Sequence, residues 1–335
     1  MTKIKPRGAF KPMLSAKDFD IEHLQYPIMV SDKFDGFRNV VVSIEGAPTS
    51  ASRKLEPIPN LKVREYFSRP ELIGLDGELV VGEPTQHKQR GKIGAVWSTI
   101  DGPDQNGGAF QGSTKWHDDY GPVYFYVFDD FSQPDLGKFE RYERAGQRLR
   151  DLNDPHIKLV VQKLVWNPQQ LMEAFNDAVS RGYEGLMIAD MEGEYKFGRA
   201  TASYDRAAAK EGKQVLKPVL LGKIKDFADE EGEIVGFIEE FENTNEKEYD
   251  ALGNAKRSSA KEGKVGKGRL GAFVVRNPKY PKTFKVSTST IPHDERPWYW
   301  ENRDKLLGKM LTYRFQPSGM DEVPQFTTFV CIRED

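Results

Sequence analysis

The residues best suited to carry chemistry lie in one short segment, DKFDGFR, which runs from Asp32 to Arg38. It begins where the apolar run YPIMV ends, and its glycine suits a tight connection. The end of an apolar strand, next to a tight turn, is an unusual place for a charge that only contacts solvent. Lys33 is therefore a candidate nucleophile, because amines form covalent intermediates in catalysis. A KxDG pattern taken alone, however, marks a surface turn more often than a catalytic site.

Five further motifs follow along the chain, and their residue types are those that bind anions, metal ions or aromatic rings. They are Ser52–Lys54, Leu75–Glu78, Tyr126–Asp129, Tyr183–Gly185 and Lys223–Lys225. Each has an ordinary explanation when taken alone: a paired surface charge, an aromatic residue of the core, or two charges on an exposed strand. Six motifs in a fixed order are far more specific than any one of them.

In this order and spacing the motifs resemble those of the covalent nucleotidyltransferase superfamily of ATP-dependent DNA ligases, RNA ligases and mRNA capping enzymes. The spacing is most similar to that of the compact DNA ligases of T7-like bacteriophages, over about residues 10–335. The resemblance implies an ATP-dependent DNA ligase that seals 5′-phosphate/3′-hydroxyl nicks in duplex DNA through a lysyl-AMP and a DNA-adenylate. Such an enzyme would serve DNA replication, repair and recombination.

The resemblance gives the Lys33 amine the role of attacking the α-phosphate of ATP to form a phosphoramidate. The amine must be neutral to attack, so we expect neighbouring cations and a bound metal ion to favour that form. Arg38 and Arg53 carry guanidinium forks suited to ribose or phosphate oxygens, and Arg53 would also contact the 5′-phosphate of the nick. Phe128 offers an aromatic face for adenine, although a core aromatic is an equally good interpretation.

The two glutamates of the motifs take different roles by resemblance. Glu78 would bind the ribose, and Glu184 would coordinate Mg²⁺ (or Mn²⁺), which favours carboxylates together with phosphates and water. Lys223 and Lys225 alternate, so on a strand both would point to one face and neutralise the triphosphate. The expected nucleotide site comprises Lys33, Asp32, Phe34, Asp35, Gly36, Arg38, Arg53, Glu78, Phe128, Glu184, Lys223 and Lys225, with Glu184 and Glu78 as metal ligands.

The first two thirds of the chain alternate strands and helices without a strict βαβ rhythm. Strands are expected within 26–45 and at 75–81, 123–128 and 184–190, and helices at 60–67, 86–100, 139–153 and between Asn167 and Gly182. This pattern favours an α+β domain of mainly antiparallel sheets with helices over a doubly wound one. By resemblance it is a nucleotidyltransferase (adenylation) domain, to which we assign residues 1–225.

After residue 225 the sequence changes to short strands separated by Gly, Asn and Pro turns. Strands are expected at 233–241, 270–276, 282–287, 309–316 and 326–332, with one helix around 294–307. Five short strands and a helix are typical of a small OB-fold β-barrel. We assign residues 226–335 to this second domain.

The net charge of −2 conceals two adjacent blocks of opposite charge. Residues 226–250 hold eleven acidic residues against one lysine, and residues 256–285 hold ten basic residues against one glutamate. The stretch NAKRSSAKEGKVGKGR is expected to be a mobile loop in the free protein and an arm that contacts phosphates when DNA binds. The expected DNA-binding residues are Arg53, Lys256, Lys261, Lys264, Lys267 and Arg269.

Several classes of protein are excluded or disfavoured by composition. One cysteine excludes a disulfide framework, and the five histidines show no zinc-ligand spacing. No apolar run approaches the roughly 20 residues that a bilayer requires, so we expect no membrane partner and a cytoplasmic location, in the host if the protein is viral. The expected working form is a monomer that encircles or clamps nicked duplex DNA, with ATP as its other substrate.

Three features depart from the family pattern. Leu220 and Leu221 stand where many relatives have an aromatic residue before the paired lysines. The segment ATASYDRAAAKEGKQ, around 200–214, is an insertion of unknown role. The terminal motif keeps Arg333 and Asp335 but ends before its lysine, which puts the orientation of the pyrophosphate leaving group in doubt.

Two alternatives remain open at this point. An RNA ligase or a capping guanylyltransferase would use the same lysine chemistry. A non-catalytic OB-type module that binds single strands, with a decayed transferase domain, belongs to a different class. The intact set of acidic and basic motif residues argues against such decay.

Overall fold

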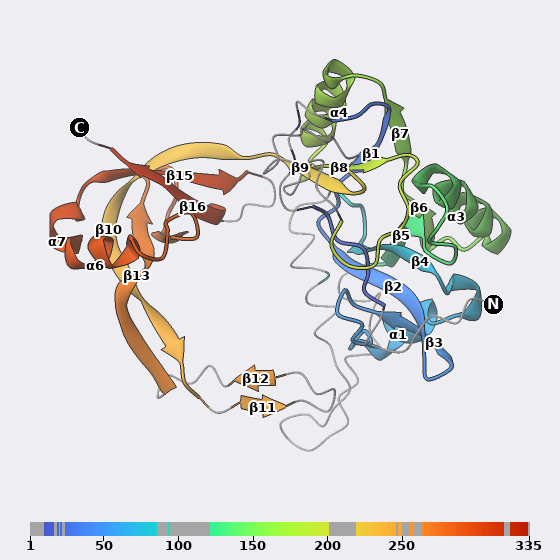
Figure 1. The fold of residues 1–335 in the computed structure, drawn as a ribbon, viewed down its shortest axis with the longest axis horizontal. Helices are drawn as coiled ribbons and strands as arrows, with labels where there is room; N and C mark the ends of the chain where they lie inside the picture. The colour runs from blue at the N-terminus through green and yellow to red at the C-terminus, as the bar shows by residue number, and fades with distance from the viewer. Residues whose placement is uncertain are drawn as a thin grey trace, which may run out of the picture. The chain divides into compact units, whose positions relative to one another are not determined.

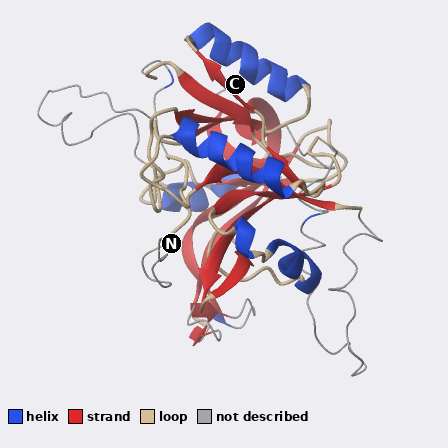
Figure 2. Cartoon of the chain, turned by 90° about the vertical axis from the view of Figure 1, so that its right-hand side faces the viewer, coloured by secondary structure: helices blue, strands red, loops and turns tan. Residues whose placement is uncertain are grey.

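The computed structural model describes residues 10–16, 19, 21, 24–85, 93, 121–200, 219–245, 247–249, 255–257, 263–317 and 322–333. The chain divides into two compact units, Met1–Lys225 and Asp226–Asp335. Strands form the framework of each unit and the helices lie against them (Figures 1 and 2). Among the described residues, no helix is long and apolar enough to cross a membrane. The helix expected at 86–100, Ile93 excepted, and the insertion from Thr201 on lie outside the described residues.

Four antiparallel strands form the first sheet of unit 1 (Figure 1). In spatial order they are β7 (Gln162–Val165), β1 (Ile28–Asp32), β8 (Gly185–Asp190) and β9 (Gly222–Lys225). Helix α4 (Pro168–Ser180) packs on this sheet and shares an apolar core with β1 and β8. Its first turn is capped as expected, because the Asn167 side chain accepts a hydrogen bond from the backbone N–H of Gln170.

The second sheet of unit 1 has five strands, antiparallel except for one parallel pair at its edge. In spatial order they are β3 (Ala47–Ala51), β2 (Phe37–Ile44), β4 (Leu75–Val81), β5 (Val123–Asp130) and β6 (Ile157–Leu159). The helices of this part are α1 (Leu61–Phe67), the short 3₁₀ helix η2 (Pro70–Leu72) and α3 (Lys138–Leu152). Residues of α1, η2 and α3 form one apolar core with the strands. The expected mixed, antiparallel α+β fold is confirmed.

Unit 2 is a closed five-stranded barrel. Around the barrel the strands are β10 (Ala228–Asn243), β13 (Lys264–Arg276), β14 (Phe284–Ser287), β16 (Gln325–Ile332) and β15 (Met310–Gln316), which pairs back to β10. The helices α6 (Arg296–Glu301) and α7 (Arg303–Leu306) stand between β14 and β15 in the chain, in place of the single helix expected there. This strand order, with its parallel β14–β16 pair, is that of an OB barrel, so the expected fold is confirmed.

The long stretch expected to be a mobile loop is partly regular structure. Strand β13 begins at Lys264, and β12 (Ala255–Arg257) pairs with β11 (Lys247–Tyr249) in a separate two-stranded sheet. Composition predicted a loop because Lys, Gly and Ser dominate this stretch. The strand forms nevertheless because its backbone groups are paired by the long neighbouring strand β10.

A buried ionic cluster ties α3 to the end of β5. The Asp129 carboxylate, only 5% exposed, accepts hydrogen bonds from Lys138 Nζ at 3.0 Å and Arg141 Nε at 2.8 Å. Burial by itself would raise the pKa of Asp129, but Lys138 and Arg141 outweigh burial and hold the pKa below its ordinary value. Arg141 also donates to the backbone carbonyl of Gly193, so the cluster holds the segment after β8 in place.

We expect Asp129→Asn to lower the free energy of unfolding by roughly 3–5 kcal/mol, because it leaves two buried cations without their counter-charge. Urea unfolding followed by circular dichroism measures this change. The matched control is Asp151→Asn on the exposed side of the same helix, which should change stability by less than about 0.5 kcal/mol. Equal effects of the two substitutions would contradict the structural role of the buried cluster.

Candidate active site

Lys33 is held at the junction of β1 and β8 by main-chain hydrogen bonds. Its backbone N–H donates to the carbonyl of Gly185 at 2.9 Å, and the N–H of Glu184 donates to the Lys33 carbonyl at 3.2 Å. Gly185 has a φ of +132°, and a Cβ there would lie 2.2 Å from the Ile224 carbonyl oxygen. Only glycine therefore lets β9 approach this closely.

One buried carboxylate joins the lysines of the site. Lys33 Nζ forms an ion pair with Glu184 Oε2, and Lys225 Nζ lies 3.2 Å from the same oxygen. Glu184 is 5% exposed. Burial would raise its pKa, but the two lysines, Lys33 first, outweigh burial and lower it. Glu184 is therefore an ionised carboxylate that brings β1, β8 and β9 together through charge.

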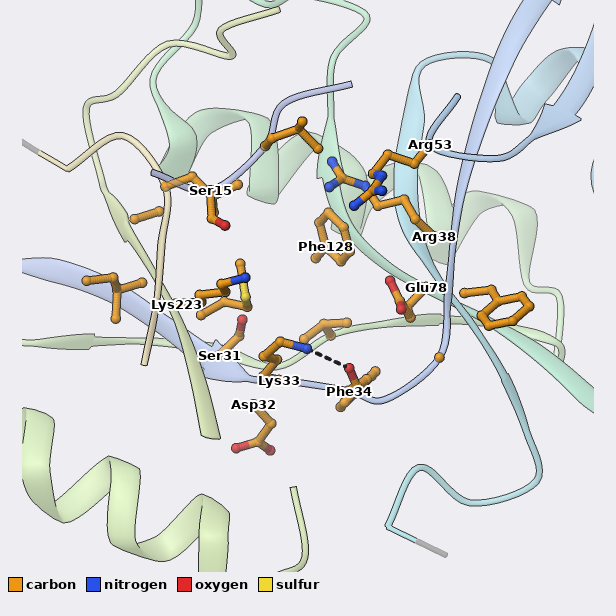
Figure 3. A pocket seen from close by; sticks show the side chains of 18 of the residues that line it. Ser15, Ser31, Asp32, Lys33, Phe34, Arg38, Arg53, Glu78, Phe128 and Lys223 are labelled. Atoms are coloured by element: carbon orange, nitrogen blue, oxygen red, sulfur yellow. Dashed lines mark hydrogen bonds between the residues drawn. The ribbon is translucent and has the colours of Figure 1, made fainter. Parts of the chain in front are cut away.

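A cavity of about 690 Å³ lies between the two sheets of unit 1 and opens beside Lys33 (Figure 3). This volume is in the range of pockets that bind nucleotide-sized ligands. Ten of the residues expected from the sequence line it: Asp32, Lys33, Phe34, Asp35, Gly36, Arg38, Arg53, Glu78, Phe128 and Lys223. Glu184 and Lys225 are not among the lining residues. Glu184 pairs with the lining residue Lys33, and Lys225 pairs with Glu184.

Arg38 forms part of the wall opposite β1, on β2. Its Nε and Nη2 donate to the two oxygens of Asp76 at 2.7 and 2.5 Å. The guanidinium carbon lies 5.1 Å from the centre of the Phe128 ring. The guanidinium of Arg38 is thus held by a buried carboxylate. In this position it contacts the Phe128 ring and also lines the cavity.

Glu78 lies on β4, opposite Arg38 in the strand register, and its carboxylate faces the cavity (Figure 3). Burial raises the pKa of Glu78 to about 7, although the positive charges of Lys33 and Arg38 act in the opposite direction. The negative charge of Glu184 adds to the rise. The two glutamates are therefore close enough to interact, and the charge of Lys33 acts on both.

Asp32 differs from the other expected residues in where its side chain goes. Both of its carboxylate oxygens accept hydrogen bonds from Arg181, each at 2.8 Å. In Figure 3 the carboxylate points away from the Lys33 side chain. Gly36 is required by close packing, because a Cβ there would lie 2.3 Å from the Leu79 carbonyl oxygen.

One wall of the cavity, formed by the segment 10–16, is not predicted by any motif of the sequence. Leu14 donates its backbone N–H to Gly198 at 2.7 Å, and Arg199 Nη1 donates to the Ser15 carbonyl at 2.9 Å. Leu14, Ser15 and Arg199 all line the cavity. No periodicity or composition marks this pairing, since its partners are more than 180 residues apart.

Positive charge gathers at this side of the cavity. Burial lowers the pKa of Lys223, and the charge of Lys33 adds to the effect. Arg199 and Arg53 act in the same direction. The cavity therefore has one cation-rich wall suited to phosphate oxygens.

The charge blocks of unit 2 are less separate in the fold than in the sequence. Acidic β10 and basic β13 are antiparallel neighbours, and Arg269 Nη2 lies 2.7 Å from Glu240 Oε1. Lys267 Nζ lies 3.5 Å from the same oxygen, and Lys264 and Lys267 are both exposed. In the protein without DNA, Lys267 and Arg269 are thus paired within the unit, and their contact with DNA stays a prediction. Lys256 is in β12, with its side chain outside the description, and Lys261 lies outside the described residues.

Two family models match the chain. Residues 12–204 match the ATP dependent DNA ligase domain, and residues 262–333 match the DNA ligase OB-like domain. The chain belongs to the ATP-dependent DNA ligase family. Its substrates are ATP and DNA, and its nucleotidyltransferase domain precedes its OB-like domain, as the sequence predicted. Among curated proteins, no sequence matches this ligase.

The chain is similar to several solved ligase structures, and the one with a TM-score above 0.5 shares its fold. A Lig E DNA ligase is 19% identical with a TM-score of 0.64, covering 96% of this chain and 99% of its own. A Chlorella virus DNA ligase-adenylate is 24% identical over 97% of this chain and 99% of its own, with a TM-score of 0.45. The ATP-dependent DNA ligase of bacteriophage T7, in complex with ATP, is 15% identical over 96% of this chain and 98% of its own, with a TM-score of 0.43.

Gly185→Ala should reduce covalent labelling of the ligase by radioactive ATP at least tenfold, because the added Cβ drives β9 and Lys225 away from Glu184. The control is Gly46→Ala in the β2–β3 turn, whose φ of +85° also disfavours a side chain but whose Cβ would meet nothing within 4 Å. Labelling is measured by gel after a single turnover. If the two variants label alike, strand approach at Gly185 is not what the site requires.

Proposed function

We propose that this ligase seals 5′-phosphate/3′-hydroxyl nicks in duplex DNA, with Lys33 as the nucleophile of the first step. The Lys33 amine bonds to the α-phosphorus of ATP and pyrophosphate leaves. The AMP then passes to the 5′-phosphate at the nick, and finally the 3′-hydroxyl attacks that phosphate and releases AMP. The observation that carries this proposal is the position of Lys33. Its side chain lines the cavity, and its amine forms an ion pair with Glu184.

The ion pair between Lys33 and Glu184 has a direct consequence for the first step. A paired ammonium is not a nucleophile, so the amine must leave Glu184 and lose its proton before attack. Lys225 stays beside Glu184 and keeps a counter-charge on that carboxylate when Lys33 departs. We infer that Glu184 binds the Lys33 amine before the reaction, and that its ion pair with Lys225 remains when the Lys33 amine moves away to attack ATP.

The adenosine part of ATP is assigned to the wall formed by β2, β4 and β5. The Phe128 ring lines the cavity and is in contact with the Arg38 guanidinium, and an aromatic ring in this position suits stacking with adenine. Glu78 lies beside it and supplies carboxylate oxygens for ribose hydroxyls. The residues that directly follow Lys33 also line the cavity: Phe34, Asp35 and Gly36.

The phosphates are assigned to the cation-rich wall. Arg53, Arg199 and Lys223 line this side of the cavity, and oppositely charged oxygens are what such a group stabilises. In the first step these cations would hold the triphosphate. In the later steps the same wall would hold the 5′-phosphate of the nick, with Arg53 exposed for that contact.

A divalent metal ion fits the donor set of this site. Among the described residues no group of three or more His, Cys, Asp or Glu side chains could hold a metal ion. Two carboxylates that face the same lysine, Glu184 and Glu78, instead suit Mg²⁺ (or Mn²⁺) with phosphate oxygens and water as the remaining ligands. When bound, such an ion neutralises charge that develops on the phosphates.

We further propose that the protein acts as a monomer and that both units, divided between residues 225 and 226, contact the duplex. Sealing must work on any sequence, so these contacts should go mainly to phosphates and sugars. A cytoplasmic location stays a prediction.

The first test is covalent labelling of the purified protein with ATP and Mg²⁺. ATP should label Lys33 and GTP should not, and Lys33→Ala should abolish labelling because the attacking amine is gone. The labelled protein should then seal nicked duplex DNA. Labelling by GTP in preference to ATP, or sealing only when the strands at the nick are RNA, would refute the proposal of a DNA ligase.

The basic stretch of unit 2 is tested by replacing Lys261, Lys264 and Lys267 together with alanine. Binding to nicked DNA should weaken, and the slope of log K against log salt should fall by about 0.9 for each phosphate that the variant no longer neutralises. Adenylylation of Lys33 should stay within about twofold, since counterion release does not bear on that step.

Alanine at Arg276, Lys279 and Lys282 is the matched control, because each of these cations lies within 3 Å of a glutamate oxygen of the same unit, closer than the 3.5 Å that separates Lys267 from Glu240. It removes the same charge and should leave the slope closer to that of the unaltered protein. Parallel loss of nick binding and adenylylation in the first variant would contradict this division of roles between the units.

A further inference from the structure

Tyr195 is not a lining residue of the cavity, yet its phenol connects the elements that form it. The residue follows β8 of the first sheet and is 3% exposed. Its hydroxyl donates to Oδ2 of Asp76 on β4 of the second sheet, at 2.5 Å. The same hydroxyl accepts a hydrogen bond from the backbone N–H of Met13 at 3.0 Å. One phenol thus joins both sheets and the N-terminal segment.

A continuous set of contacts leads from Tyr195 to the cavity wall. Asp76 is fully buried and holds Arg38 through both carboxylate oxygens. Arg38 in turn lies over the Phe128 ring, and both residues line the cavity. Oδ2 of Asp76 accepts from Tyr195 as well as from Arg38 Nη2. The phenol therefore restricts rotation of the carboxylate that orients the guanidinium.

We propose that Tyr195 is a positioning residue for ATP binding, which acts through Asp76 and Arg38 on the aromatic wall at Phe128. This inference rests on the proposed function, since it concerns how the same cavity accepts the adenosine part of ATP. Lys33 stands on the other side of the cavity and is held by Glu184, independently of Tyr195. Loss of the phenol hydroxyl should therefore affect nucleotide binding much more than the chemical step.

The chain contains a matched set of residues away from the cavity. The Tyr66 hydroxyl lies 3.0 and 3.1 Å from the oxygens of Asp154, and Arg69 Nη2 donates to Asp154 at 2.7 Å. This set reproduces the phenol, carboxylate and guanidinium of the first, in the same unit, but none of its members lines the cavity. Tyr66→Phe therefore controls for the general effect of removing a hydroxyl from such a network.

The experiment compares Tyr195→Phe with Tyr66→Phe in single-turnover adenylylation of Lys33 at varied ATP, together with thermal unfolding. Tyr195→Phe should raise the ATP concentration for half-maximal rate about tenfold and change the rate at saturating ATP by less than about twofold. Tyr66→Phe should leave both values unchanged. A Tyr195→Phe protein that unfolds at lower temperature but keeps the ATP dependence of the unaltered protein would show a merely structural role and overturn the inference.

A second comparison tests the route through Arg38. In an Arg38→Lys protein, which lacks the guanidinium fork, adding Tyr195→Phe should cause no further rise in the ATP requirement. A full additional tenfold rise would show that Tyr195 does not act through Arg38 and would also overturn the inference.

Two further outcomes are distinguishable. If Tyr195→Phe shows no cooperative unfolding, Asp76→Asn takes its place with the same expected rise, and an unchanged ATP requirement in that variant counts against the inference. If the unaltered protein does not label Lys33 with ATP, the proposed function itself fails. Direct binding of ATP to the Tyr195→Phe and Tyr66→Phe proteins, measured by calorimetry, then decides the inference by the same tenfold difference.

Discussion

The active site depends on one buried negative charge, the carboxylate of Glu184. A carboxylate that is withdrawn from water needs compensating positive charge, and here Lys33, directly after β1, and Lys225, at the end of β9, provide it. The three strands β1, β8 and β9 must therefore come together in one register for the charge to be tolerated. The proposed nucleophile is placed by the same requirement, because Lys33 is one of the two cations that satisfy it.

The second wall of the cavity follows the same physical rule with different residues. Asp76 is fully buried and is satisfied by Arg38 and Tyr195, and Asp129 is satisfied by Lys138 and Arg141. Asp76 links segments that are 38 and 119 residues away in the chain, whereas Asp129 joins the end of β5 to the start of the next helix, α3. The cavity is thus bounded by side chains whose own partners are already engaged, which limits their motion and keeps the walls in place for a ligand.

Unit 2 shows how strand pairing changes the meaning of a charge pattern. In the sequence the acidic block, 226–250, and the basic block, 256–285, are separate, and each carries charge of almost one sign. In the barrel β10 and β13 run antiparallel, so Glu240 faces Arg269 and Glu233 faces Arg276. Among the described residues of the basic block, five cations are thereby paired with glutamates of the same unit: Lys267, Arg269, Arg276, Lys279 and Lys282.

The sequence by itself determined the family, the order of the motifs and the position of most strands and helices. These properties are local: the β-branched run of β2, the Asn-Pro start of α4 and the Lys-x-Lys alternation of β9 each depend on neighbouring residues. It also predicted that Lys33, Glu184 and Lys223 belong to one site, and in the structure Lys33 pairs with Glu184 and lines the same cavity as Lys223.

Only the tertiary structure decided which partner each side chain has. The Asp32 carboxylate accepts hydrogen bonds from Arg181, and the Arg38 guanidinium donates to Asp76. The Arg199 guanidinium donates to the carbonyl of Ser15. Nothing within a few residues of any of these groups specifies its partner. The partners are set by sheet order and register, which arise from burying apolar faces and satisfying buried charges across the whole unit.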